Sequence, residues 1–291
     1  MLEGAVRGGK INSQKVVLTN SGSLLHIQKQ FGKKRLDQIK PSDLAVWQNR
    51  MLETLATKTV KTIRTVFNAV FDDAMKDEII KRNPFTLIRS PTGEEMREKK
   101  PFSLEEIDLI LSNAPKSMKA FFAIGFFTGM RTGEIIGLRW SDIDYEENII
   151  KVQRSRRQGI ESLPKTKNSI RDVEILDTLK PFILEHQELS DDNKSGYVFE
   201  TSFGRPFNTT DKISYWYWRP LLKELDIPYR NLYQMRHTFA SMMISEGEDI
   251  LWVSNMLGHK DSSMTLQKYA RYIKNTKKKR AQFLNEKLSS S

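Results

Sequence analysis

An arginine beside a helix start is the first feature of this sequence that points to chemistry. Arg131 lies in the run TGMRTGE, after a glycine and directly before a segment that favours helix. A helix N-terminus with a guanidinium beside it is a good site for an anion. Glu134, three residues further on, shares the face of Arg131 and can hold that side chain in an ion pair. The alternative is an ordinary capped turn that binds nothing.

A second arginine opens the amphipathic segment YQMRHTFAS. Tyr233 and Arg236 are three residues apart, so on a helix they point the same way. His237 is adjacent in sequence, but it points about 100° away and is expected to be structural. Further on, the run LGHKD contains His259 at the end of one helix, and TLQKYAR contains Tyr269 in the next.

Several kinds of chemistry are excluded by residues that the sequence lacks. It has no cysteine, which excludes disulfides, a thiolate nucleophile and a zinc site with sulfur ligands. It has no glycine-rich phosphate loop followed by Lys and Ser or Thr, which argues against a nucleotide-driven motor. No carboxylates pair in an obvious metal-binding arrangement, and the four histidines form no zinc motif. A metal-free reaction is therefore the starting hypothesis.

The charge of the chain predicts a polyanionic partner. Its 291 residues include 47 Lys and Arg against 36 Asp and Glu, a formal net charge of +11. Such a surplus most often marks a nucleic-acid-binding protein, although a peripheral membrane protein or a merely basic one are alternatives. No apolar run approaches the roughly 20 residues that span a bilayer, and the N-terminus lacks the apolar region of a secretory signal. We therefore expect a soluble cytoplasmic protein.

The elements that position these residues are expected to form two domains. The pattern predicts a disordered or appended N-terminus over residues 1–20, a small helical domain over 21–88 and a charged linker over 89–101. A larger, mainly helical domain with a small antiparallel sheet follows over 102–276, and residues 277–291 form a basic tail.

The clearest helix of the first domain is predicted over about residues 58–76. One arc of it is apolar, and this arc contains Val60, Ile63, Val66, Phe67, Val70, Phe71 and Ala74. The opposite face carries Lys58, Lys61, Thr62, Thr65 and Asn68. Such a polar face is usually only solvated, but these cations and hydroxyls have no nearby carboxylate and can reach phosphates.

In the second domain, Ser103 and Glu106 form a capping box that starts the first helix. Two strands are predicted at about 149–153 and 172–175, joined by a polar turn that contains Gly159 and Lys165, and a third strand at 197–200. Further helices are predicted at about 117–128, 132–138, 177–187, 210–225, 233–246, 249–257 and 263–273.

Four of these motifs together resemble a known family. TGMRTGEIIGLRW, YQMRHTFAS, LGHKD and TLQKYAR resemble, in order and with fitting separations, the signature boxes of the tyrosine recombinases, the phage integrase family. The first domain, with FGKKRLDQIKPSDL and Asn83-Pro84-Phe85, is similar to the helical core-binding domain of that family. The resemblance covers about residues 21–272. It implies the two-domain tyrosine recombinase architecture, a core-binding domain followed by a catalytic domain.

The resemblance implies a chemistry as well. Such enzymes attack a DNA phosphodiester with a tyrosine hydroxyl, form a 3′-phosphotyrosine and release a 5′-hydroxyl, without ATP, metal or another cofactor. By match to the motifs, Arg131 and Arg236 clamp the phosphate and His259 hydrogen-bonds it. Tyr269 matches the nucleophile, with Tyr272 as the alternative.

Three more residues receive roles from the same match. Lys165 matches the lysine that protonates the departing oxygen, with Lys167 as a rival, and Glu134 matches the acidic residue that supports the first arginine. Tyr233 stands where the family usually has histidine. A phenol can donate a hydrogen bond to phosphate but cannot supply a positive charge near neutral pH. The loss of one such donor can cost on the order of 10² in rate.

The leading hypothesis is a site-specific recombinase of a phage or mobile element. It would hold double-stranded DNA between its two domains, with Lys58, Lys61, Thr62 and Thr65 among the DNA-binding residues, and would act as a homotetramer on synapsed sites, away from membranes. The alternatives are a DNA-binding protein of the same fold that no longer cuts, a relaxing enzyme similar to topoisomerases, and a recombinase that resolves chromosome dimers.

Overall fold

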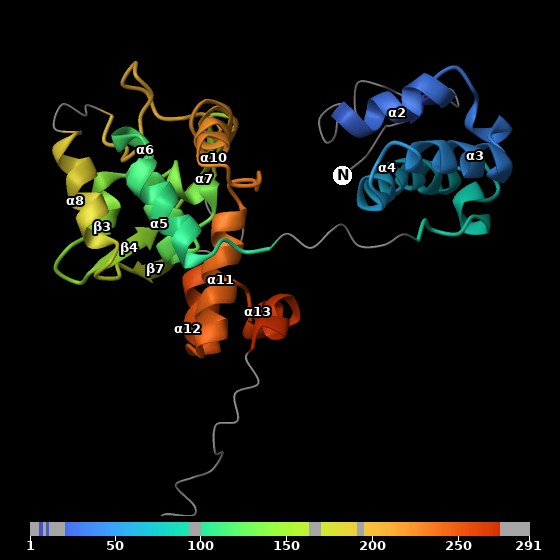
Figure 1. The fold of residues 1–291 in the computed structure, drawn as a ribbon. Coiled ribbons are helices and arrows are strands. Elements are labelled where there is room, and N and C mark those ends of the chain that lie inside the picture. Colours follow the sequence, from blue (N-terminus) through green and yellow to red (C-terminus); the bar gives the residue numbers. More distant parts are fainter. Residues whose placement is uncertain are drawn as a thin grey trace, which may run out of the picture. The chain divides into compact units, whose positions relative to one another are not determined.

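The computed structural model describes residues 6–7, 10–11, 21–92, 100–162, 170–190 and 195–273. The chain divides into two compact units, Met1–Glu98 and Lys99–Ser291, which we describe separately (Figure 1). The boundary between them lies within the segment 89–101 that the sequence analysis treats as a linker. The fold is mainly helical with a small antiparallel sheet, which confirms the predicted fold class.

In its described residues, the first unit contains three α-helices around an aromatic core. These are α2 (Ser21–Phe31), α3 (Pro41–Leu52) and α4 (Thr57–Lys76), with short 3-10 turns at Leu36–Gln38 and Pro84–Leu87. The rings of Phe31, Trp47 and Phe67 meet with centroids 5.3 to 5.6 Å apart. The predicted apolar arc of α4 is buried except for Val66, which is partly buried.

Residues 1–20 contain one short pairing that the sequence did not predict. Strands β1 (Val6–Arg7) and β2 (Lys10–Ile11) pair antiparallel. The rest of residues 1–20 lies outside the described residues.

The second unit is built on a three-stranded antiparallel sheet in the order β3-β4-β7. The strands are β3 (Ile143–Asp144), β4 (Ile149–Val152) and β7 (Arg171–Glu174), and Val152 faces Arg171 across the ladder. Helices α5 (Leu104–Asn113), α6 (Lys116–Thr128) and α8 (Lys180–Glu188) belong to the same unit (Figure 1). The predicted capping box is present: the Ser103 hydroxyl accepts from the Glu106 amide, and the Glu106 carboxylate accepts from the Ser103 amide.

Four predicted elements of this unit were wrong in part. The polar turn before 163–169 contains a hairpin, β5 (Ser155–Arg157) with β6 (Ile160–Ser162). The strand expected at 197–200 consists only of isolated bridges. The helix expected at 132–138 is the short α7 (Thr132–Ile135). The helix at 210–225 is α9 (Thr210–Ile213), a π-helical turn at Ser214–Trp218 and α10 (Arg219–Glu224).

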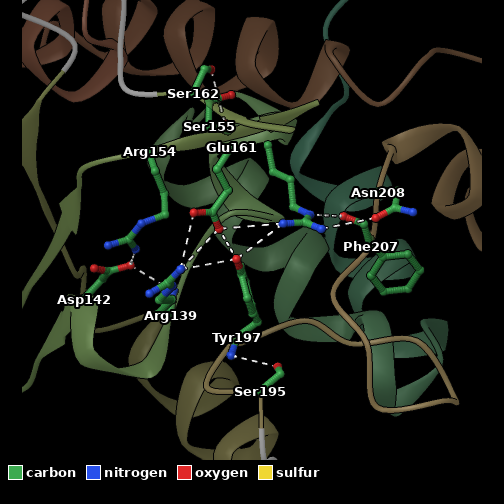
Figure 2. Close-up of polar contacts among 11 residues, drawn as sticks. Arg139, Asp142, Arg154, Ser155, Glu161, Ser162, Ser195, Tyr197, Phe207 and Asn208 are labelled. Atoms are coloured by element: carbon green, nitrogen blue, oxygen red, sulfur yellow. Dashed lines mark hydrogen bonds and ion pairs between the residues drawn. The ribbon is translucent and has the colours of Figure 1, made fainter. Parts of the chain in front are cut away.

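Tertiary contacts explain two of these differences. Trp218, the last residue of the π-helical turn, is fully buried, and its indole donates to the carbonyl of Arg230. The π-helical turn accompanies this packing of Trp218. Around the β5–β6 hairpin, the guanidinium groups of Arg139 and Arg156 both pack against the ring of Tyr197, at 5.0 and 5.4 Å from its centroid. Glu161 accepts from Arg139 and from the hydroxyl of Tyr197 (Figure 2). The ladder of β5 with β6 holds the hairpin itself together, and these side chains join the hairpin to Tyr197.

The last helices of the described chain are α11 (Gln234–Glu246), α12 (Ile250–Leu257) and α13 (Ser262–Tyr269), followed by a 3-10 turn at Ala270–Tyr272. The predicted helix at 263–273 therefore changes type directly after Tyr269. In the part of the chain that the structure describes, no helix is both long and apolar enough to span a membrane.

Candidate active site

Arg131 caps the N-terminus of α7, as its place in the sequence predicts. Gly129 ends α6 with φ of +64°, a left-handed conformation that turns the chain toward α7. The Nη1 atom of Arg131 lies 2.8 Å from the Glu134 carboxylate, so the predicted ion pair is present. The Arg131 Nη2 atom donates to the carbonyl of Gly258 at 3.3 Å. The guanidinium is thus fixed between α7 and the end of α12.

Behind this pair lies a further arginine that no motif in the sequence assigns to the site. Arg171, on β7, donates from Nη2 to Glu134 at 2.9 Å and from Nε to the carbonyl of Met256 at 2.9 Å. Burial raises the pKa of Glu134, but the charges of Arg171 and Arg131 outweigh it and hold that pKa below its ordinary value. Glu134 is therefore a carboxylate shared by two guanidinium groups, and it joins Arg171 on the sheet to Arg131 at the start of α7.

Gly258 belongs to the same arrangement because it has no side chain. Its φ is +63°, and a Cβ there would lie 2.7 Å from Nη1 of Arg171. Both the backbone conformation and the space require glycine. The glycine of the LGH motif thus lets α12 end directly against Arg171, which brings His259 to the site.

Arg236 is buried on the first turn of α11. Its Nη1 atom donates to the carbonyls of Gly129 at 2.9 Å and Leu257 at 2.6 Å. Its Nε is buried without a hydrogen-bond partner among the described residues. Burial, and then the charge of Arg131, lowers the pKa of Arg236 to about 10, so it is still a cation at neutral pH. Two carbonyls hold Nη1, and the Nε edge has no protein partner among the described residues, so it can donate to the oxygens of an anion such as phosphate.

His259 follows α12 as a neutral imidazole. Its Nδ1 atom lies 2.7 Å from the hydroxyl oxygen of Thr265, which is fully buried on α13. Burial, together with the charges of Arg236 and Arg131, lowers the pKa of His259 to about 4. At neutral pH this residue can therefore contribute a hydrogen bond to a phosphate, but not a charge.

Tyr269 is the last residue of α13 and is only 1% exposed. Its hydroxyl oxygen lies 2.8 Å from Nδ1 of His237 on α11. Burial raises the pKa of Tyr269 well above its ordinary value, against the opposing charge of Arg236. We expected His237 to be structural and did not anticipate this contact, since 32 residues separate the pair. No spacing rule relates α11 to α13, so only the tertiary packing reveals it.

Tyr233 lies at the start of α11 beside this pair. Its ring packs edge-on against His237 with centroids 5.0 Å apart, and the ammonium of Lys268 lies 5.6 Å from its centroid. Burial raises the pKa of Tyr233, but the charges of Arg236, Lys268 and Arg131 outweigh it and hold that pKa below its ordinary value. Tyr233 is 39% exposed and therefore contacts solvent, whereas Tyr269 does not.

The remaining predicted residues fall in different places. Lys165 and Lys167 lie outside the described residues. Tyr272 is partly buried with its ring centroid 6.5 Å from that of Tyr269, and its hydroxyl accepts from Arg271. Among the ranges described above, no group of three or more His, Asp or Glu side chains could hold a metal ion.

The predicted DNA-binding residues belong to the first unit. Lys58, Lys61, Thr62 and Thr65 are all exposed on α4. The two threonine hydroxyls donate to helix carbonyls, Thr62 to Lys58 at 3.0 Å and Thr65 to Lys61 at 2.9 Å. The lysines are therefore the main free donors of this face.

The site thus contains two fixed arginines, a neutral histidine and a buried tyrosine, in a mainly helical unit with a small sheet. Comparison with known sequences identifies the class of protein to which this fold and site belong. A sequence profile described as the phage integrase family matches residues 100–276. A XerC-like tyrosine recombinase of Caldanaerobacter subterraneus subsp. tengcongensis is 30% identical over 285 residues, which cover 87% of this chain and 72% of the relative. The ICEBs1 integrase of Bacillus subtilis is 29% identical over 281 residues, 90% of this chain and 75% of that one.

Among solved structures, the fold is similar to that of the Tn1549 transposon integrase in complex with a circular intermediate DNA. The TM-score is 0.76 at 22% identity, with 89% of this chain and 90% of that chain covered. The chain belongs to the phage integrase family and is a tyrosine site-specific recombinase.

Proposed function

We propose that this recombinase is the integrase of a mobile element and that Tyr269 is its nucleophile. The observation that carries the proposal is the convergence of Arg131, Arg236, His259 and Tyr269 from four separate elements. The mobile-element role rests on the similarity to the ICEBs1 and Tn1549 integrases. Because a XerC-like recombinase is also among the relatives, resolution of chromosome dimers is the alternative role.

In this proposal each residue has one task. The hydroxyl of Tyr269 attacks phosphorus, and the bond from phosphorus to the 5′-oxygen breaks. Arg131 and Arg236 stabilise the charge on the non-bridging oxygens with preorganised donors, and neutral His259 adds a hydrogen bond. Lys165 gives the leaving oxygen its proton. The ester bond energy is kept in the phosphotyrosine, and the reverse attack by a 5′-hydroxyl rejoins the strand.

The rest of the chain would serve binding and assembly. Residues 21–88 would form the core-binding domain, with Lys58 and Lys61 toward the phosphates, and residues 102–276 the catalytic domain. Exchange between two duplexes needs four cleavages, and one nucleophile in each copy implies a tetramer on synapsed DNA. The reaction would take place in the cytoplasm.

Tyr233 supports a second candidate, a DNA-binding protein that no longer cuts. A phenol beside the phosphate cannot replace the charge of an imidazolium, and this loss would slow cleavage. Cations around Tyr233 lower its pKa, however, which strengthens the phenol as a hydrogen-bond donor. We therefore favour an active enzyme.

The test is a nicked suicide substrate that carries the recombination site. We expect a covalent protein–DNA adduct on a denaturing gel in the presence of EDTA, and none for Tyr269→Phe. A native-gel shift of the same DNA without any adduct would support the non-cutting candidate. A two-site recombination assay beside a supercoil-relaxation assay separates a recombinase from a relaxing enzyme.

A further inference from the structure

The side chain that touches the nucleophilic oxygen of Tyr269 is His237, which none of the family motifs assigns to the reaction. Its Nδ1 atom lies 2.8 Å from that oxygen, and the two rings are tilted by 55° with centroids 5.6 Å apart. A phenol hydroxyl at this distance from an unprotonated ring nitrogen donates a hydrogen bond to it.

A buried phenol needs a proton acceptor before it can attack phosphorus. Tyr269 is 1% exposed, so bulk water cannot take its proton directly. Burial also raises the pKa of Tyr269, which makes the neutral phenol the resting form. The proton must therefore pass to a neighbouring side chain as the new bond forms.

The other groups around Tyr269 are poor acceptors. Arg236 is a cation with two donated bonds to carbonyls, and the ammonium of Lys268 lies over the Tyr269 ring at 5.9 Å. His259 directs its Nδ1 to Thr265. Tyr233, at the position where the family usually has histidine, packs on His237 and not on the Tyr269 hydroxyl. Only His237 offers an imidazole nitrogen to the reacting oxygen within the described part of the chain.

We propose that His237 is the proton acceptor for Tyr269 in this enzyme. As the Tyr269 oxygen bonds to phosphorus and the bond to the 5′-oxygen breaks, the phenolic proton passes to Nδ1 of His237. The leaving oxygen takes its proton from a separate donor. In rejoining, the incoming 5′-hydroxyl loses its proton to that donor and His237 returns its proton to Tyr269, so both groups end as they began. The inference rests on the proposed function, since it needs Tyr269 to be the nucleophile.

The test measures single-turnover adduct formation on the suicide substrate at saturating protein. His237→Asn keeps a short polar group that can accept a hydrogen bond but cannot take a proton. We expect its rate to fall by about 10² to 10⁴, with DNA binding and melting temperature close to those of the wild type. His237→Ala should fall similarly and be partly restored by added imidazole. His26→Asn, an exposed histidine of the first unit, is the matched control and should cleave at the wild-type rate.

A second substrate separates the two proton transfers. Sulfur in place of the bridging 5′-oxygen gives a leaving group that departs without protonation, which restores variants that have lost the general acid. We expect it not to restore His237→Asn. Wild-type or faster cleavage by His237→Asn, or its restoration by the sulfur substrate, would overturn the inference and leave Tyr269 as the nucleophile. If the wild type forms an adduct that Tyr269→Phe retains, the proposed function fails, and the inference fails with it.

Discussion

The two units of the chain hold their cations in different ways. On α4 of the first unit, Lys58 and Lys61 are exposed, and neither forms an ion pair within the described residues. In the second unit, Arg131, Arg171 and Arg236 are each fixed by carboxylates or carbonyls. The partly buried Arg64 of the first unit serves packing, because its guanidinium donates to the carbonyl of Ile88 at 2.7 Å.

This difference matches two different physical tasks. A mobile ammonium can neutralise a DNA phosphate in many geometries, which gives affinity that depends on salt. A fixed guanidinium spends no free energy on reorganisation when charge develops in a transition state, which gives rate. We therefore expect substitutions in the first unit to change affinity and substitutions in the second to change rate or stability.

Among the cations of the two units, the largest effect is expected for Arg236→Ala. This change removes the buried donor edge from the phosphate, so adduct formation should slow by about 10² to 10³. Single-turnover cleavage at saturating protein measures it. Arg236→Lys should recover little, because an ammonium cannot hold both carbonyls and also present a planar edge. If Arg236→Ala lost affinity for DNA but kept the wild-type rate of cleavage, the expected difference between the two units would be contradicted.

Arg171→Met should act on stability. It leaves Glu134 buried with one partner fewer, and breaking a buried pair in this way costs about 3–5 kcal/mol of the free energy of unfolding. Urea denaturation measures the loss. The matched control is Arg157→Met on the exposed part of β5, which should change stability by less than about 0.5 kcal/mol. Equal effects would contradict the proposed role of the Glu134 pair.

The pH dependence of stability should report His259. Its pKa is about 4 in the folded chain and near 6.5 when unfolded, so only the unfolded state takes up this proton between those values. Stability contributed by His259 is therefore present above about pH 6.5 and is lost as the pH falls toward 4. We expect His259→Asn to remove about 1–2 kcal/mol of that loss, measured as unfolding free energies at pH 7 and pH 5. An unchanged difference between the two pH values would show that His259 is not held neutral.

The smallest effect is expected on the first unit. Lys58→Ala with Lys61→Ala should weaken DNA binding several-fold and reduce the slope of log affinity against log salt by about 2. Titrations at several salt concentrations measure this slope. Lys76→Ala, a lysine of the same helix that pairs with Asp73, is the control and should leave the slope close to that of the wild type. If the slope were unchanged in the double variant, α4 would not be part of the DNA interface.

Local signals predicted much of this fold. The periodicity of 58–76 identified α4 and its buried arc, and the Ser103 capping box marked the start of α5. Both depend on residues within a few positions of one another, where helix geometry alone decides the outcome. The order of the four motifs likewise predicts Arg131, Arg236, His259 and Tyr269 as site residues, and the structure describes the positions of all four.

Contacts between distant elements escaped prediction. Nothing in the sequence around Arg171 marks it as a site residue. It becomes the partner of Glu134 only because α7 and α12 approach β7 in the folded chain. His237 was assigned by its direction on α11 alone, without α13 opposite it. The π-helical turn at Ser214–Trp218 depends in the same way on where Trp218 packs.

The most direct test of the account is to identify the amino acid that carries the DNA. The adduct formed on the suicide substrate in EDTA would be digested with a protease and a nuclease, and the modified peptide sequenced by mass spectrometry. The account predicts a nucleotide on Tyr269 alone. A nucleotide on Tyr272 or Tyr233, or an adduct that persists in Tyr269→Phe, would contradict it.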